Sequence, residues 1–271
     1  MGFDESKIRN AVYRPFTKIS LCYAPMFVDR MGTFGEFLPT PTQEKTNRVI
    51  CVNLSVERPF TCLMTNLLPN LVYAGGFGSA TYCFALYSYS PDGKERRDNI
   101  GRSTLDRFIA HYDDDRLTRE DIFYYVYAVL HHPDYRARYA ENLKRELPRI
   151  PLTGTAKDCH AFAQAGRKLA ALHTGYESVK PYKLKRIESS AVPPNWRVEA
   201  MKLTKEGDAV LYNEWLTLHG IPPEAHAYRL GNRSALAWVI DQYRVERDKD
   251  GELISDPNAP GDEEAIVRLV G

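Results

Sequence analysis

The sequence lacks the cysteine patterns and the charge imbalance that identify several classes of protein. Its five cysteines are odd in number and widely spaced, without a CxxC pair, which argues against a disulfide framework or a structural zinc site. We expect reduced, buried thiols, as in a cytoplasmic protein. Lys and Arg number 36 against 35 Asp and Glu, so the net charge neither predicts nor excludes a nucleic-acid partner.

Long apolar segments are also missing. No apolar run approaches the roughly 18–20 residues that a membrane span needs, and the N-terminal residues MGFDESKIRN are charged, unlike a signal peptide. The sequence therefore predicts a soluble, cytoplasmic protein without membrane contacts.

Recognisable catalytic motifs are absent as well. The strings nearest to the polar-Pro-Pro-aromatic loop of amino-methyltransferases begin at Val192 and Ile221, which are aliphatic where that loop needs a polar acceptor. The glycine-rich residues 75–78 are followed by no helix signature, and no GxxxxGK[ST] string is present. We therefore expect no catalytic residue and no cofactor in this chain.

Two groups of possible metal ligands have simpler interpretations. Asp113, Asp114 and Asp115 are consecutive, so their side chains rarely converge on one ion, and we expect an exposed acidic loop. His131 and His132 are adjacent at the end of a predicted helix, about 100° apart. We expect them to act as cationic partners of the helix dipole, and we predict no metal site.

The patterning predicts an α+β fold made of three parts of one domain. Residues 1–98 form a β-rich part, with strands over 47–54, 58–64 and 82–89. Residues 99–178 form a helical bundle, with helices over 103–112, from 118 to 132, over 134–147 and over 155–173. Ser103 is the expected cap of the first helix, and Thr118 with Asp121 forms a capping-box pattern for the second.

Residues 179–271 are expected to complete the same domain. A basic connector over 180–194 precedes a hairpin of strands 197–203 and 209–215, with its turn at 205–208. A helix capped by Ser234 spans 234–247, a polar stretch covers 248–262, and helical sequence resumes at 263–270. The charged start and the abrupt apolar end of the chain indicate a segment excised from a longer polypeptide.

Clusters of cations with aromatic or amide side chains are the main features that favour binding. They lie at residues 13–18, 180–186 and 228–234, and the last cluster precedes a helix N-terminus, which favours phosphate. Arg and Asn are also the usual partners of guanine and adenine in the major groove. Each cluster alone is equally consistent with a solvated surface, and 228–234 with helix capping. The predicted DNA-binding residues are Arg14, Lys18, Arg58, Lys183, Lys185, Arg186, Arg229, Asn232 and Arg233.

Four strings carry a resemblance to a known family. They are residues 11–18 (AVYRPFTK), 121–151 (DIFYYVYAVLHHPDYRARYAENLKRELPRIP), 162–176 (FAQAGRKLAALHTGY) and 228–245 (YRLGNRSALAWVIDQYRV). Together they resemble the C-terminal specificity domain of type ISP restriction–modification enzymes, and the resemblance spans nearly the whole chain. The second and fourth strings are the most specific.

The resemblance implies a bacterial or archaeal target-recognition domain that binds double-stranded DNA sequence-specifically. Such a domain positions one adenine for an adjoining adenine-N6 methyltransferase domain, in a polypeptide that also carries a nuclease and a helicase-like ATPase. S-adenosylmethionine, ATP and Mg²⁺ are then cofactors of the parent enzyme. Two alternatives stay open: a divergent catalytic domain, either nuclease or methyltransferase, and an interdomain brace without DNA contacts. Metal-dependent nicking or cofactor binding would indicate the first, and an even scatter of surface cations would indicate the second.

Overall fold

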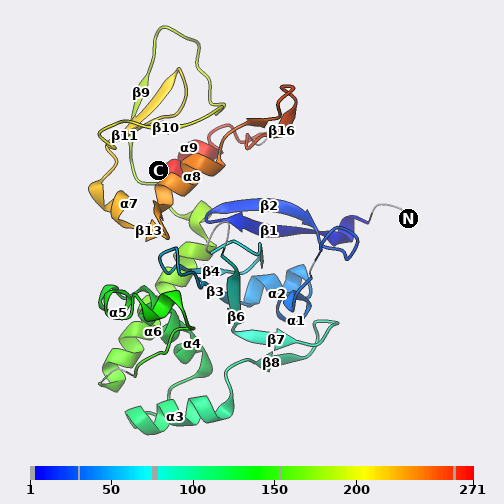
Figure 1. Ribbon diagram of the computed structural model, residues 1–271, viewed down its shortest axis with the longest axis vertical. Helices are drawn as coiled ribbons and strands as arrows, with labels where there is room; N and C mark the ends of the chain where they lie inside the picture. The colour runs from blue at the N-terminus through cyan, green and yellow to red at the C-terminus, as the bar shows by residue number, and fades with distance from the viewer. Residues whose placement is uncertain (1–3, 30, 75–78, 153, 259–260) are drawn as a thin grey trace. The chain divides into compact units, whose positions relative to one another are not determined.

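The computed structural model describes residues 4–29, 31–74, 79–152, 154–258 and 261–271. The glycine-rich residues 75–78 lie outside this set. The chain divides into two compact units, which Figure 1 shows coloured along the sequence. Unit 1 consists of Met1–Arg14 and Lys18–Thr174, and unit 2 consists of Pro15–Thr17 and Gly175–Gly271. Both units mix helices with small sheets, which confirms the predicted α+β class.

Unit 1 begins with three small sheets. A short 3₁₀ turn, Glu5–Lys7, leads into the first sheet, of order β2-β1-β5, with β1 Ile8–Arg14, β2 Thr17–Cys22 and β5 Leu68–Pro69. The second has the order β4-β3-β6, with β3 Val49–Asn53, β4 Cys62–Thr65 and β6 Thr81–Ala85. The third pairs β7 Tyr87–Tyr89 with β8 Arg96–Asp98, and the helices α1 Phe34–Phe37 and α2 Pro41–Thr46 precede β3. All of β3 is buried, because it is the central strand of its sheet.

The strand predicted over 82–89 is divided at Leu86 into β6 and β7, which belong to different sheets. The buried side chain of Asn47 explains the division. Its Nδ2 donates to the carbonyl of Tyr87 at 2.9 Å, and its Oδ1 accepts from the Tyr87 amide at 3.0 Å. One amide side chain thus takes the place of a neighbouring strand at this point.

The helical part of unit 1 contains α3 Arg102–Tyr112, α4 Arg119–His131, α5 Pro133–Arg138, the 3₁₀ turn Asn142–Lys144 and α6 Ala156–Thr174. The capping box of Thr118 and Asp121 is confirmed, with both reciprocal bonds present. The predicted cap Ser103 is wrong, because α3 begins one residue earlier, after Gly101, and has no side-chain cap. The helix predicted over 134–147 is interrupted after α5, and the 3₁₀ turn brings Leu143 into the core.

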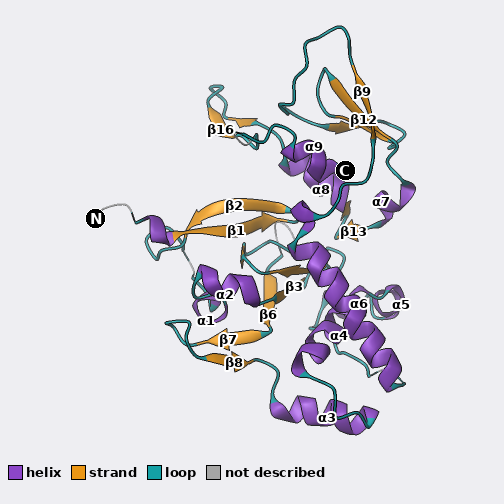
Figure 2. Cartoon of the chain, turned by 180° about the vertical axis from the view of Figure 1, so that it is seen from behind, coloured by secondary structure: helices purple, strands orange, loops and turns teal. Residues whose placement is uncertain are grey.

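α4 is the central helix of unit 1, and seven of its thirteen residues are buried. It packs beside α6, as Figure 2 shows, and Gly166 allows the two backbones to approach closely. The fully buried tyrosines Tyr125 and Tyr127 place their hydroxyls on partners, Tyr125 donating to the carbonyl of Pro151 at 2.6 Å. These two tyrosines are therefore core residues whose polar ends are satisfied.

Unit 2 contains a four-stranded antiparallel sheet of order β10-β11-β12-β9. Its strands are β9 Lys185–Glu188, β10 Lys202–Leu203, β11 Ala209–Leu211 and β12 Leu216–His219. Two small hairpins follow, β13 Arg229–Leu230 with β14 Arg233–Ser234 and β15 Glu246–Arg247 with β16 Leu253–Ser255. The helices are the 3₁₀ turn Tyr176–Ser178, α7 Pro223–Ala227, α8 Ala235–Gln242 and α9 Ala265–Val270. Val210, Leu216 and Leu218 pack in one core with Val239 of α8 and Ile266 of α9.

Several predictions for unit 2 are confirmed in part. The turn between β10 and β11 contains Gly207 at a φ of +77°, a left-handed conformation that glycine adopts without strain. Ser234 caps α8, accepting from the Ala237 amide, but that helix ends at Gln242. The strand β9 lies within the expected connector, and the β15–β16 hairpin occupies the expected end of a helix and a polar stretch. Along the described ranges, no helix is both long and apolar enough to cross a membrane.

Candidate nucleic-acid interface

The register of the sheet in unit 2 separates its side chains onto two faces. In antiparallel strands, directly opposite residues point to the same side. Ile187 of β9 is opposite Thr217, which is opposite Leu211, which is opposite Lys202. These four residues form one row across the sheet, on the side away from the core residues Leu216 and Leu218. We call this side the outer face.

The outer face is partly exposed, with Ala209 buried at its edge, and it carries cations beside aliphatic side chains. Ile187 and Leu211 expose 43% and 44% of their surface, and Lys202 is also exposed. In the next row Lys185 is opposite His219. Exposed aliphatic groups with flanking lysines are chemically suited to a nucleic-acid surface, because they offer phosphate contacts beside apolar contacts for thymine methyl groups.

Lys185 and Arg186, both predicted to bind DNA, point to opposite faces of β9. Arg186 is opposite Leu218 on the core side of the sheet. Its guanidinium bonds the carboxylate of Glu264 at 2.8 Å and lies 5.3 Å from the ring centre of Trp196. Arg186 thus has a structural partner. Lys183 is exposed just before β9.

Arg229, Asn232 and Arg233, the predicted residues of the cluster at 228–234, lie in the β13–β14 hairpin, and their contacts are largely local. Arg229 donates to the carbonyl of Asn232 across the turn. Arg233 bonds the carboxylate of Asp241 at 2.7 Å, and its guanidinium is 5.2 Å from the ring centre of Trp238. These contacts fix the hairpin against α8.

The remaining predicted residues belong to unit 1. Arg14, at the end of β1, is half-buried and stacks on its neighbour Tyr13, with its guanidinium carbon 4.3 Å from the ring centre. Lys18 follows in β2, after a turn in which Phe16 adopts a left-handed φ of +58°. Arg58 is half-buried in the bend between β3 and β4.

A groove in unit 2 contains residues that the sequence analysis missed. It has a volume of about 860 Å³, with the residues before β10 on one side and the β11–β12 turn on the other. Its lining mixes apolar, amide and charged side chains, among them Val192, Pro193, Asn195, Lys202, Leu211 and Glu214. The alternation of apolar and polar residues in LTLH, residues 216–219, was a usable signal for the outer face. No local pattern indicates the groove, because its walls come from separate segments.

The acidic and histidine groups considered as metal ligands have other partners. Asp114 is buried, accepts from Arg116 at 2.8 Å and from His160 at 2.9 Å, and these bonds hold its pKa far below the usual range. The expectation of an exposed acidic loop is therefore wrong for Asp114. In the described parts of the chain, no cluster of three or more His, Cys, Asp or Glu residues is arranged to hold a metal ion.

His131 of unit 1 is half-buried, with its Nε2 atom out of contact with solvent, and this burial of the ring holds its pKa well below the ordinary value. It is therefore neutral at pH 7, and the expected role as a charged partner of the helix dipole is wrong for this residue. Its neighbours include His173, whose Nδ1 is hydrogen-bonded to the hydroxyl of Tyr127.

Comparison with known proteins identifies the family. The model of the Type ISP C-terminal specificity domain matches residues 1–269. A nuclease-deletion mutant of the Type ISP restriction–modification enzyme LlaGI, solved with a DNA substrate mimic, is 33% identical over the whole chain, with a TM-score of 0.81. DrdV, solved in a complex with DNA, has 34% sequence identity to this chain over its whole length, with a TM-score of 0.84. The ATP-dependent Type ISP enzyme LlaBIII, bound to DNA, is 28% identical over the whole chain, with a TM-score of 0.85.

The chain covers only part of each of these proteins, 24% of the LlaGI chain, 27% of the DrdV chain and 18% of the LlaBIII chain. Curated proteins contain no match to it. A family model that matches nearly every residue, together with likeness in fold along the whole chain, is decisive: the chain belongs to the Type ISP C-terminal specificity domain family.

Proposed function

We propose that this chain recognises a specific sequence in double-stranded DNA and positions a target adenine for an adjoining adenine-N6 methyltransferase domain. The observation that carries the proposal is the likeness, along the entire chain, to three proteins solved in complex with DNA or a DNA mimic. The proposed setting is the cytoplasm of a bacterium or archaeon, where a restriction–modification enzyme meets DNA.

In this proposal the chain supplies recognition and no chemistry. S-adenosylmethionine, ATP and Mg²⁺ are assigned to the methyltransferase and helicase-like domains of the parent polypeptide, and any extrusion of the adenine from the duplex is assigned to the methyltransferase. The chain's own contribution is to fix the register and orientation of the duplex, which phosphate contacts do, and to select the sequence, which base contacts do.

The predicted cations differ in how readily they can meet phosphate. Lys183 and Lys185 are exposed, and Lys185 lies on the outer face with Lys202. Arg186 and Arg233 each hold a carboxylate, so a phosphate has to compete with Glu264 or Asp241 for them. We therefore place the main phosphate contacts of unit 2 on the outer face and retain Arg14, Lys18, Arg58, Arg229 and Asn232 as candidates for further contacts.

Selection of duplexes from a randomised library by the purified chain, at two salt concentrations, tests the proposal. Enrichment of one short motif that contains an adenine is the expected result. Binding without enrichment at low salt would contradict sequence recognition by this chain alone. No binding at either salt concentration would favour the interdomain brace, and metal-dependent nicking of the library would favour a catalytic domain.

A further inference from the structure

Residues 195–199, which lie before β10, form neither helix nor strand, yet all five of their carbonyls accept hydrogen bonds. We call them the held segment. Nδ2 of Asn213 donates to the carbonyls of residues 195 and 197 at 2.8 and 2.9 Å. The Tyr212 hydroxyl donates to residue 196 at 2.8 Å, Asn258 Nδ2 to residue 198 at 2.9 Å, and the Val245 amide to residue 199 at 2.9 Å. Irregular segments this exposed usually leave such groups to water, so this one is held in a single conformation.

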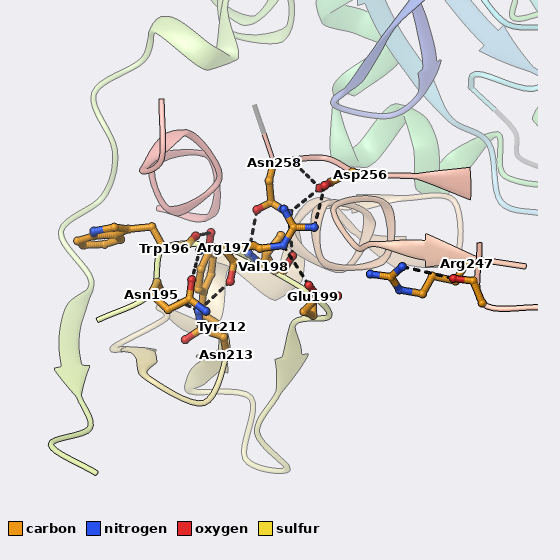
Figure 3. Close-up of polar contacts among 11 residues, drawn as sticks. Asn195, Trp196, Arg197, Val198, Glu199, Tyr212, Asn213, Arg247, Asp256 and Asn258 are labelled. Carbon is orange, nitrogen blue, oxygen red and sulfur yellow. Dashed lines mark hydrogen bonds and ion pairs between the residues drawn. The ribbon is translucent and has the colours of Figure 1, made fainter. Parts of the chain in front are cut away.

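Asn258 has the most specific of these contacts. It is sixty residues away in sequence, and it bonds both backbone groups of Val198, accepting from the amide and donating to the carbonyl, each at 2.9 Å. Its own position is fixed by Asp256, which accepts from the Asn258 amide at 3.0 Å. Asp256 also accepts from Arg197 at 2.7 Å, and Figure 3 shows these side chains converging on one point. Bonds from Asn258 and Arg197 lower the pKa of Asp256 to about 2, so its carboxylate is charged throughout the neutral range.

An exposed loop at residues 189–194 leads into the held segment, residues 195–199, and both contribute to the groove described above. Its walls offer donors and acceptors together: Asn195 provides an amide, Lys202 an ammonium group and Glu214 a carboxylate, while Val192 and Leu211 provide apolar contacts. A surface that only held phosphates would be uniformly basic. The mixture matches the chemistry of base edges in the major groove, where carboxylates accept from cytosine and aliphatic groups contact thymine.

We propose that residues 189–195 and the β11–β12 turn form the surface by which unit 2 contacts base edges of duplex DNA, with Asn213 and Asn258 as positioning residues that fix it in advance. The proposal rests on the proposed function. The bonds from Asn213 and Asn258 hold residues 195–198, which anchor the C-terminal end of the loop. A loop anchored before binding loses less conformational entropy when DNA arrives, which strengthens binding to the matching sequence. Non-specific binding depends on phosphates and is independent of this loop.

The experiment compares Asn213→Ala and Asn258→Ala with wild type, using the duplex selected above and a scrambled duplex of equal length. Asn213→Ala removes four side-chain hydrogen bonds and Asn258→Ala removes three. We expect the Kd for the selected duplex to rise about tenfold in each variant, while the Kd for the scrambled duplex and its salt dependence stay within about twofold. Asn99→Ala is the matched control, because it removes a similar bond from Nδ2 to a backbone carbonyl, that of Ala85 in unit 1. Asn99→Ala should leave the ratio of the Kd for the scrambled duplex to the Kd for the selected duplex unchanged.

Two variants at side chains outside the hydrogen-bond network complete the test; Glu214 is exposed, and Val192 is partly buried against the core of unit 2. Val192→Ala and Glu214→Gln touch none of the bonds that hold the segment, and a repeated selection with them should relax or change the preferred base at one or two positions. Unchanged preference in both variants, or an unchanged ratio in Asn213→Ala and Asn258→Ala, would overturn the inference while leaving recognition by the wild-type chain intact. Failure of the wild-type chain to enrich any sequence would overturn the proposed function, and this inference with it.

Discussion

Gly166 of α6 faces the backbone carbonyl of Tyr124 in α4 so closely that a Cβ built on the glycine would lie 1.9 Å from that oxygen. Neither backbone can move away without disturbing the central helix pair of unit 1. The close approach explains why a glycine is placed in the middle of a long helix, where it weakens helix formation by about 1 kcal/mol relative to alanine.

Gly166→Ala should therefore destabilise the protein in spite of alanine's higher helix propensity. We expect the free energy of unfolding to fall by at least about 2 kcal/mol, since the added methyl group forces the helices apart. Urea denaturation followed by circular dichroism measures it. Gly35→Ala in α1 is the control, because nothing lies within 4 Å of its added Cβ. Equal midpoints for Gly166→Ala and wild type would contradict the described packing of α4 and α6.

Stability should depend on pH through His173, a buried histidine of unit 1. Burial, with a smaller contribution from Arg136, lowers the pKa of His173 to about 4. In the unfolded chain His173 binds a proton below its ordinary pKa of about 6.5, whereas in the folded chain it stays neutral down to about pH 4. The free energy of unfolding is therefore highest above pH 6.5 and falls as the pH is lowered towards 4. The shift corresponds to about 3 kcal/mol.

Urea midpoints of wild type and His173→Gln at pH 7.5, 6 and 5 test this dependence. The variant is expected to be less stable at pH 7.5 but to lose less stability than wild type on acidification. His132→Gln, which changes a half-exposed histidine next to His131, should keep the wild-type slope. Parallel slopes for wild type and His173→Gln would show that folding does not lower the pKa of His173.

The salt dependence of DNA binding should come more from the outer face of the sheet in unit 2 than from the core side of the same sheet. Lys185→Gln combined with Lys202→Gln should reduce the slope of log K against log salt by about two, one for each lost phosphate contact. Arg186→Gln should change it less, because Arg186 is joined to Glu264 on the other face. Titrations of a scrambled duplex at several salt concentrations measure both slopes. A larger effect of Arg186→Gln would place the duplex on the opposite side of β9.

Thiol reactivity should separate the five cysteines into two groups. Cys22 and Cys83 are half-buried, whereas Cys51, Cys62 and Cys159 are buried. Burial raises the pKa of Cys62 to about 12 and that of Cys159 to about 11, and it also raises the pKa of Cys51, which lowers the fraction of reactive thiolate.

With a disulfide reagent at pH 7.5, Cys22 and Cys83 should react in the native protein and the other three only after denaturation. Cys22→Ser should remove one equivalent from the fast phase and leave the slow phase unchanged. Fast reaction of Cys62 or Cys159, identified by mass spectrometry, would contradict the described burial.

Local patterns account for the parts of the fold that were predicted well. The capping box of Thr118 and Asp121, the cap at Ser234 and the turn at Gly207 each depend on residues within four positions, so the sequence shows them directly. The apolar spacing of α4 and α6 is local in the same sense. The short strands were predicted less well. β9 has four exposed residues, and only its pairing with β12 makes it a strand.

The candidate interface was predicted in composition but not in arrangement. Lys185 was identified, whereas Lys202 was not. The two share a face only through the pairing of the two strands between them, β11 and β12. Arg186 and Arg233 have the composition of binding residues, yet the tertiary structure gives each a carboxylate partner. Charge can be counted from a sequence, but whether a cation is available depends on what folds against it.

The sequence by itself determined the family, the α+β class, the main helices and the caps at Thr118 and Ser234, because these depend on short-range spacing and on the strings that resemble the family. The tertiary structure alone decided which side chains share a surface. Asn258 bonds Val198 across sixty residues, and Gly166 meets Tyr124 across two helices. Such contacts arise from the packing of distant segments, whose partners are selected by shape and burial in the folded chain and leave no periodic signal in the sequence.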